Sequence, residues 1–77
     1  MYEEFLINEI SRLAFRKVTA TEPLISSGIL DSIMVVDLAI SIEKKFGIKI
    51  PFTDILPENF NTVDLIGKFI DQSKKPL

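Results

Sequence analysis

Apolar residues recur at helical spacing in the middle of the chain, between Asp31 and Gly47. At 100° per residue, one arc of this segment carries the residues expected to face a core: Val35, Leu38, Ala39, Ile42 and Phe46. A second apolar arc beside it carries Ile33, Val36 and Ile40. A third arc could face water and carries Met34, Asp37, Ser41, Lys44 and Lys45. A helix so apolar must be covered by several neighbours or expose a patch for a partner.

Both ends of this central segment carry helix signals. Asp31 or Ser32 can cap the start, because either side chain can accept a hydrogen bond from an unpaired backbone N–H. Gly47 follows the last apolar residue, where a left-handed C-cap causes no Cβ strain. Lys44 and Lys45 lie in the last turn, where the macrodipole favours cations. The pattern therefore predicts one helix between Asp31 and Gly47.

Two further amphipathic helices are predicted on either side of it. The first runs from residue 2 to about 17, with Leu6, Ile10, Leu13 and Ala14 on one face and Glu9 spaced to pair with Arg12. The last begins after Asn61 or Thr62, either of which can cap it, and its core stripe is Val63, Ile66 and Ile70. Gly67 inside it costs about 1 kcal/mol against alanine, which would suit a close helix contact. Residues 72–77 are expected to fray.

The segments between these helices are not uniformly polar. Residues 18–30 form a long loop, and its four large apolar residues predict that it crosses the core: Leu24, Ile25, Ile29 and Leu30. Residues 48–51 read as an extended connector, and residues 52–60 as short helical turns in which Ile55, Leu56 and Phe60 close one end of the core. The sum is a single all-α domain over residues 1–77, ordered over about 3–71: a bundle of three main helices plus a short helix, with a long first loop.

Composition excludes several classes of function. The 77 residues include no cysteine and no histidine, which removes protein thiolates, the usual general base and the commonest metal ligand. A net charge of −2 gives no basic footprint for nucleic acid. The acidic start is unlike a signal peptide, and no apolar run approaches the ~20 residues needed to span a bilayer. We expect a soluble, cytoplasmic, monomeric protein that is not an enzyme and has no metal site.

One hydroxyl occupies a position that could carry chemistry. Ser32 lies in the first turn of the central helix, where backbone N–H groups and the positive end of the dipole would stabilise an attached phosphate. As a bare dipeptide, however, Asp31-Ser32 is more often an ordinary helix cap. Ser26 and Ser27 are rival hydroxyls, but they precede the Gly28 turn rather than a helix.

Three stretches of the sequence resemble the acyl carrier protein family. The first is Gly28-Ile29-Leu30-Asp31-Ser32-Ile33, which is similar to the family's attachment motif. The second is the apolar helix that ends Glu43-Lys44-Lys45-Phe46-Gly47-Ile48-Lys49-Ile50-Pro51, and the third is Phe60-Asn61-Thr62-Val63-x-Leu65. The Asp-Ser pair alone is a weak signal, whereas the three stretches in this order and spacing, over roughly residues 4 to 71, are a fairly strong one.

The resemblance implies a function for several of these residues. Ser32 would receive a 4′-phosphopantetheine arm from a phosphopantetheinyl transferase, and Asp31 would assist the Mg²⁺-dependent transfer. A loading ligase would then attach acyl or aminoacyl groups as thioesters, and a downstream synthase or transferase would remove them. Partner enzymes would contact the central helix at five positions: Ile33, Met34, Val36, Asp37 and Ile40. For the apolar members of that set, simple core packing or tolerated exposure is the alternative explanation.

The departures from the family pattern point to a dedicated pathway. Carriers of general fatty-acid synthesis have a strongly acidic central helix, whereas here Met34 occupies a position where an acid is frequent, and Lys44 and Lys45 follow Glu43. The motif also resembles standalone carriers, including D-alanyl carriers. We therefore expect a specialised discrete carrier. The alternative is an unmodified helical interaction module with the same fold, in which Ser32 only caps a helix.

Overall fold

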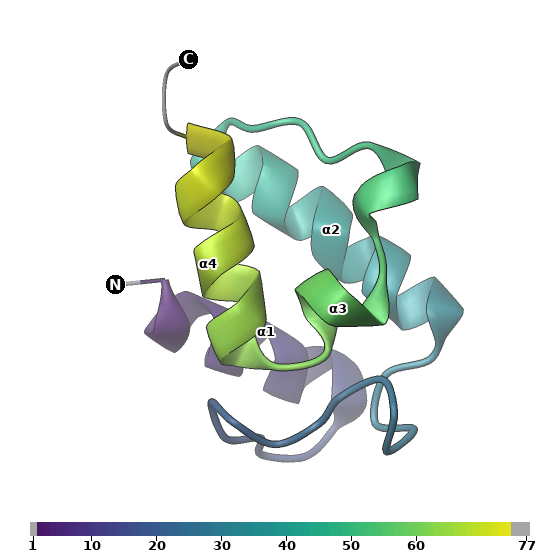
Figure 1. The fold of residues 1–77 in the computed structure, drawn as a ribbon. Helices are drawn as coiled ribbons and strands as arrows, with labels where there is room; N and C mark the ends of the chain where they lie inside the picture. Colours follow the sequence, from purple (N-terminus) through teal and green to yellow (C-terminus); the bar gives the residue numbers. More distant parts are fainter. Residues whose placement is uncertain (1, 75–77) are drawn as a thin grey trace.

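The computed structural model describes residues 2–74, and these residues contain helices but no strand (Figure 1). In chain order the elements are α1 (Glu3–Ala14), α2 (Ser32–Phe46), the 3₁₀ helix η1 (Phe52–Asp54), α3 (Pro57–Phe60) and α4 (Val63–Lys74). The prediction of an all-α bundle with three main helices, a short helix and a long first loop is confirmed. No helix within residues 2–74 has both the length and the apolar character needed to cross a membrane.

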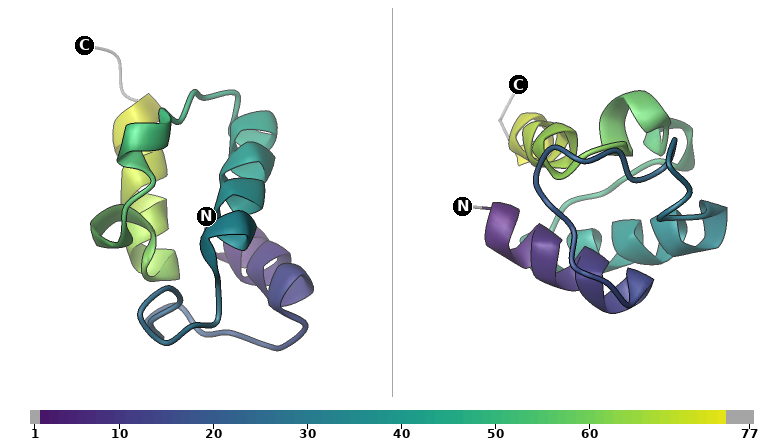
Figure 2. Two further views of the ribbon diagram at one scale, coloured as in Figure 1. Left: turned by 90° about the vertical axis from the view of Figure 1, so that its right-hand side faces the viewer. Right: turned by 90° about the horizontal axis from the view of Figure 1, so that it is seen from below.

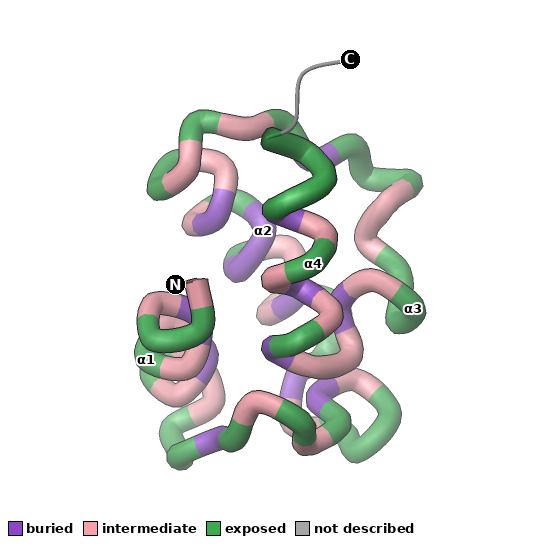
Figure 3. The backbone as a smooth tube through the Cα atoms, turned by 60° about the vertical axis from the view of Figure 1, so that its left-hand side comes forward, coloured by how far each residue is buried: buried purple, intermediate pink, exposed green. Residues whose placement is uncertain are grey.

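The three long helices enclose one apolar core. Helix α1 packs against both α2 and α4, and α3 packs against α4. Buried and exposed residues alternate along these helices, as expected for amphipathic segments (Figure 3). The largest fully buried side chains come from all of these elements and from the first loop: Phe60, Leu6, Ile10, Leu24, Leu38, Ile42, Ile66 and Ile70.

The long first loop passes beneath the ends of α2 and α4, while the connector after α2 crosses the opposite end (Figure 2). Leu24 and Leu30 of this loop are buried in the core. The backbone N–H of Leu24 donates to the carbonyl of Asn61 at 2.6 Å, and that of Asp64 donates to the carbonyl of Ala20 at 3.1 Å. The loop is therefore fixed across the core, as its composition predicted.

Helix α1 ends earlier than predicted, at Ala14 rather than near residue 17. Phe15 adopts the left-handed conformation, with φ 57°, and its N–H donates to the carbonyl of Ser11. The turn lets Val18 enter the core, where it is 5% exposed, and lets its N–H donate to Ser11 Oγ at 3.3 Å. Burial of Val18 thus outweighs continuation of the helix, and it leaves Phe15 95% exposed.

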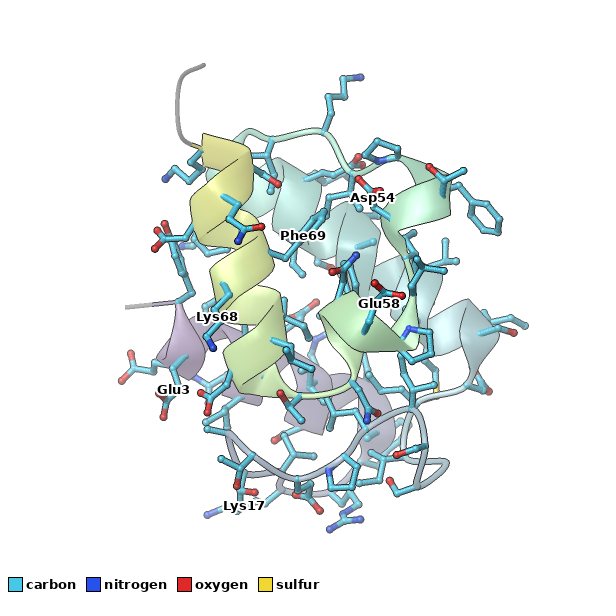
Figure 4. All side chains as sticks on the ribbon, viewed as in Figure 1. Glu3, Lys17, Asp54, Glu58, Lys68 and Phe69 are labelled. Atoms are coloured by element: carbon cyan, nitrogen blue, oxygen red, sulfur yellow. The ribbon has the colours of Figure 1, made fainter. Side chains whose placement is uncertain are left out.

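Helix α4 begins where it was predicted to begin and extends further than predicted at its end. Thr62 Oγ1 accepts from the N–H of Leu65 at 3.1 Å and so caps the helix, whereas the side chain of Asn61 turns to the first loop. Residues 72–74 were expected to fray but are helical, while residues 75–77 lie outside the described part of the chain. In Figure 4, Phe69 points from α4 into the bundle and Lys68 points away from it.

Two expectations about packing are wrong. A Cβ built at Gly67 meets no atom within 4 Å, so this glycine does not serve a close helix contact. Leu56 was expected in the core, and it is 41% exposed, although Phe60 is fully buried and Ile55 half-buried. Leu56 precedes Pro57 and is extended, with φ −126° and ψ 153°, as residues before proline prefer. That conformation leaves its side chain outside the core.

An aromatic cluster joins the ends of three helices. The Phe46 ring meets Tyr2 at 5.0 Å and Phe5 at 5.5 Å between centroids, both edge to face. Lys74 Nζ lies 5.7 Å from the Phe46 centroid and 5.8 Å from that of Tyr2. Edge-to-face pairs and cations near ring faces are both attractive, so this cluster ties the start of α1 to the ends of α2 and α4.

Candidate functional site

Ser32 is the first residue of α2, and its neighbour performs the capping. Asp31 is extended, with φ −90° and ψ 179°, and its Oδ1 accepts from the N–H of Met34 at 2.8 Å. Of the two candidates for the cap, the structure therefore selects Asp31. Ser32 is exposed, and its hydroxyl is free of the capping role. A hydroxyl placed in this way can be reached by an enzyme.

A hollow of about 200 Å³ opens beside Ser32. Its walls come from the first loop, the first turns of α2 and the η1–α3 segment: Ile25, Asp31, Ser32, Val35, Val36, Phe52, Ile55 and Pro57. Most of these side chains are apolar, and Phe52 is 79% exposed. A larger hollow of about 370 Å³ lies between the start of α1 and α4, but it contains no hydroxyl of a serine or threonine. The hollow beside Ser32 is therefore the better candidate on chemical grounds.

The most exposed line along α2 combines residues from two of the arcs that the sequence defined. Ile33 is 72% exposed and Ile40 is 45% exposed, and Asp37 and Lys44 are exposed between and after them. These positions are spaced by four, three and four residues, so they share one face of the helix. We call this set of four residues the outer face of α2. It is apolar at two positions and charged at two.

Two of the predicted contact residues lie off this outer face. Val36 is half-buried and lines the hollow beside Ser32. Met34 was placed on the arc that could face water, but it is half-buried and packs against the core. Ser41 of the same arc is also half-buried, and its hydroxyl donates to Glu9 Oε2 of α1 at 2.8 Å. The flank that carries Met34 and Ser41 is therefore largely covered.

Glu9 of α1 joins a salt bridge within its own helix to the hydrogen bond that links α1 to Ser41 of α2. Arg12 Nη2 lies 2.6 Å from Glu9 Oε2, which is the predicted pair. Its hydrogen bond to Glu9 lowers the pKa of that carboxyl group, burial opposes the shift, and the Ser41 hydroxyl lowers the pKa further. The pKa of Arg12 is raised, mainly by Glu9 and to a lesser extent by the charge of Asp37. Asp37 thus lies in the field of a cation from the neighbouring helix.

Three residues around the site were not predicted from the sequence to belong to it. Ile25 and Phe52 line the hollow, and Asn61 holds the loop that precedes Ser32. The exposed Phe52 follows Pro51 in a segment of mixed polarity, and nothing in that pattern distinguishes a buried from an exposed ring. Asn61 was predicted, as an alternative to Thr62, to cap the last helix, which its type and position both favour.

Most of the chain is similar to known proteins. Residues 5–70 match the protein-family model described as a phosphopantetheine attachment site. The chain belongs to this family. It is 36% identical over 66 residues to a D-alanyl carrier protein of Streptococcus uberis, which covers 83% of this chain and 84% of the relative. It is 32% identical over 72 residues to a D-alanyl carrier protein of Streptococcus pyogenes serotype M5, which covers 91% of each.

Membership of the phosphopantetheine attachment site family confirms the resemblance seen in the sequence. The chain is a carrier protein with covalently attached 4′-phosphopantetheine. Carriers of this kind are generally non-catalytic. An exposed hydroxyl at the start of α2, beside a mainly apolar hollow, fits a group that joins through a phosphodiester and carries its cargo at the far end.

Proposed function

We propose that the 4′-phosphopantetheine arm is attached at Ser32 and that the chain carries D-alanine as a thioester in a dedicated biosynthetic pathway. The observation that supports Ser32 is its exposed place at the first position of α2, with Asp31 rather than Ser32 acting as the cap. The proposed cargo rests on the relatives, whose name is D-alanyl carrier protein. The chain itself is not an enzyme in this proposal, and it acts in the cytoplasm.

The residues around Ser32 suit an attached phosphodiester. The unpaired N–H groups of the first helical turn and the positive end of the macrodipole would stabilise its negative charge. Asp31 Oδ1 is occupied by the N–H of Met34, and the exposed carboxylate can still offer oxygen to Mg²⁺ during transfer. The arm supplies the thiol that a chain without cysteine lacks.

We further propose that partner enzymes dock on the outer face of α2. The partners are a phosphopantetheinyl transferase, a ligase that loads the amino acid, and a transferase that accepts it. Ile33 and Ile40 offer exposed apolar surface and Asp37 a negative charge, while Val36 would be met at the edge of the hollow. Met34 contributes less direct contact, because it is half-buried.

A variant on the outer face of α2 tests this docking surface. Ile33→Ala should lower kcat/KM for modification by about tenfold. It should change the free energy of unfolding by less than about 0.5 kcal/mol, since exposed sites away from special features vary within that range. The matched control is Phe15→Ala, which removes an even more exposed apolar side chain outside α2 and should leave kcat/KM unchanged. Equal losses in the two variants would contradict docking at α2.

The first experiment on attachment is an intact-mass measurement. The protein is incubated with coenzyme A, Mg²⁺ and a broad-specificity phosphopantetheinyl transferase, alongside Ser32→Ala and Ser27→Ala. We expect one added phosphopantetheinyl group on the wild type and on Ser27→Ala, and none on Ser32→Ala. A folded wild type that gains no mass would refute attachment and favour the unmodified interaction module, in which Ser32→Ala changes little.

A second experiment tests the cargo. The modified protein is incubated with ATP and a D-alanine ligase, and separately with fatty acyl donors and an acyl ligase. Formation of a D-alanyl thioester that hydroxylamine releases is the expected result. Loading with fatty acyl groups alone would favour the alternative, a carrier for a specialised acyl pathway. The small size of the hollow beside Ser32, about 200 Å³, supports a small cargo in this proposal.

A further inference from the structure

Asn61 makes an unusual set of hydrogen bonds to the loop that leads to Ser32. Its Oδ1 accepts from the backbone N–H groups of Ile25 and Ser26, at 2.8 and 3.0 Å. Its Nδ2 donates to Ser26 Oγ at 3.3 Å, and its carbonyl accepts from the N–H of Leu24 at 2.6 Å. One residue thus binds three consecutive loop residues. We call these four hydrogen bonds the Asn61 clamp.

The clamp reaches Ser32 through a short and well-bonded stretch of chain. The N–H of Gly28 donates to the carbonyl of Ile25 at 3.1 Å, and that of Leu30 donates to the carbonyl of Leu24 at 2.9 Å. Leu30 is buried and is followed directly by Asp31, the cap of α2. Residues 24–30 therefore form one compact turn, held at one end by Asn61 and joined at the other to the start of α2.

The clamp also connects two walls of the hollow beside Ser32. Ile25 forms part of one wall, and its N–H is held by Asn61. Pro57 forms part of another wall, and its carbonyl accepts from the N–H of Asn61 at 2.9 Å. Asn61 therefore fixes the spacing between the first loop and α3. A change at this residue alters the shape of the hollow without touching α2 itself.

We propose that Asn61 is a positioning residue for the modification of Ser32: it holds the loop so that α2 presents the serine in the form that the transferase binds. This inference rests on the proposed attachment at Ser32. A released loop would populate that form for only part of the time, and the apparent affinity of the transferase would fall by the same fraction. Once bound, the serine would react as before. Loss of the clamp should therefore raise KM more than it lowers kcat.

Three variants separate positioning from simple stability. Asn61→Leu keeps the approximate size of the side chain and removes the three side-chain hydrogen bonds of the clamp, while the bond from Leu24 to the backbone carbonyl remains. Asn61→Asp keeps an oxygen that can accept from Ile25 and Ser26. Thr62→Ala is the matched control, because it removes the cap of α4 at the next residue and leaves the hydrogen bonds between Asn61 and the loop in place. All are assayed with coenzyme A and a phosphopantetheinyl transferase, at a temperature where each variant is shown to be folded by circular dichroism.

We expect Asn61→Leu to raise KM about tenfold, which corresponds to about one tenth of the molecules being in the form that the transferase binds. The kcat should stay within about twofold of the wild-type value. The KM of Asn61→Asp should lie close to the wild-type value, and the KM of Thr62→Ala should equal it. Amide hydrogen exchange should accelerate at Ile25, Ser26 and Met34 in Asn61→Leu only.

Several outcomes would overturn the inference. A wild-type KM in Asn61→Leu would do so, as would an equal rise in Thr62→Ala, since the effect would then be one of stability. Unchanged exchange at Met34 would show that the clamp does not reach α2. These results are distinct from failure of the proposed function, in which the wild type itself gains no phosphopantetheinyl group and both proposals fall together.

Discussion

Replacement of Gly67 by alanine should stabilise the protein by about 1 kcal/mol, because alanine exceeds glycine in helix propensity by that amount. Gly67 lies inside α4 and is not among the glycines with positive φ. A Cβ added there meets no atom within 4 Å, so the gain is not offset by a steric clash. For a domain of this size, 1 kcal/mol corresponds to a rise in Tm of about 4–8 °C.

Gly47 provides the matched control for this change. An added Cβ also meets no atom within 4 Å there, but the residue has φ +67° and ends α2, with its N–H donating to the carbonyl of Glu43 at 2.9 Å. A left-handed conformation costs a residue with a side chain about 1–2 kcal/mol. Gly47→Ala should therefore destabilise the protein by about that amount. The same chemical change thus has opposite signs at two uncrowded sites.

Urea denaturation followed by circular dichroism measures both effects. The free energy of unfolding is compared at an unchanged slope against denaturant, which shows that the unfolded states are equivalent. The reasoning would be refuted if Gly67→Ala lowered the free energy of unfolding, since that would mean a steric or functional demand at Gly67 that its open surroundings do not reveal. A neutral Gly47→Ala would likewise contradict the assigned cost of positive φ.

Three further results are expected. Phe15→Asn should stabilise the protein by up to about 1 kcal/mol in thermal unfolding, because asparagine tolerates the left-handed conformation better and the lost side chain is 95% exposed. Phe46→Leu should cost about 1–3 kcal/mol in urea denaturation, from two edge-to-face pairs worth about 0.5–1.5 kcal/mol each. Hydrogen bonds from Arg12 and Ser41 lower the pKa of Glu9 in the folded state, although burial opposes the shift. The stability that the ionised Glu9 contributes to the fold is therefore present at neutral pH and is lost as the pH falls through that pKa. Glu9→Gln should therefore be less stable than the wild type at pH 7, with the difference shrinking in acid.

The bounds of a helix could be predicted from the sequence where local signals mark both of its ends. The start and end of α2 follow from Asp31 and Gly47, and both residues act as expected. The predicted end of α1 was wrong because the true end depends on Val18, whose burial requires the chain to turn at Phe15. A turn made by an exposed phenylalanine in the left-handed region has no local signal, since glycine or asparagine is the usual choice there.

The proposed attachment serine could be singled out from the sequence for a similar reason, whereas the contacts around it could not. Ser32 is identified by neighbouring residues along the chain. The contact that we propose positions it joins residues distant from each other in sequence: Asn61 binds Ile25, which lies 36 positions away, and both residue types have commoner local explanations. Asparagine before a helix is read as a cap, and the structure shows that Thr62 takes that role and frees Asn61 for the loop. Contacts of this kind follow from the fold and become visible only with it.

Helical periodicity could not decide which part of α2 is left uncovered. It grouped Met34 with Asp37 on the arc that could face water and Ile33 with Ile40 on a second apolar arc, because it gives only the angular position of each residue on the helix. Coverage depends instead on how the rest of the fold packs around the helix, which leaves Met34 half-buried against the core and both isoleucines exposed. The exposed part of these isoleucines gains nothing from folding of the isolated chain, since that apolar surface stays in water. Their stabilising effect would be realised only when another protein covers that surface, which agrees with docking on the outer face of α2.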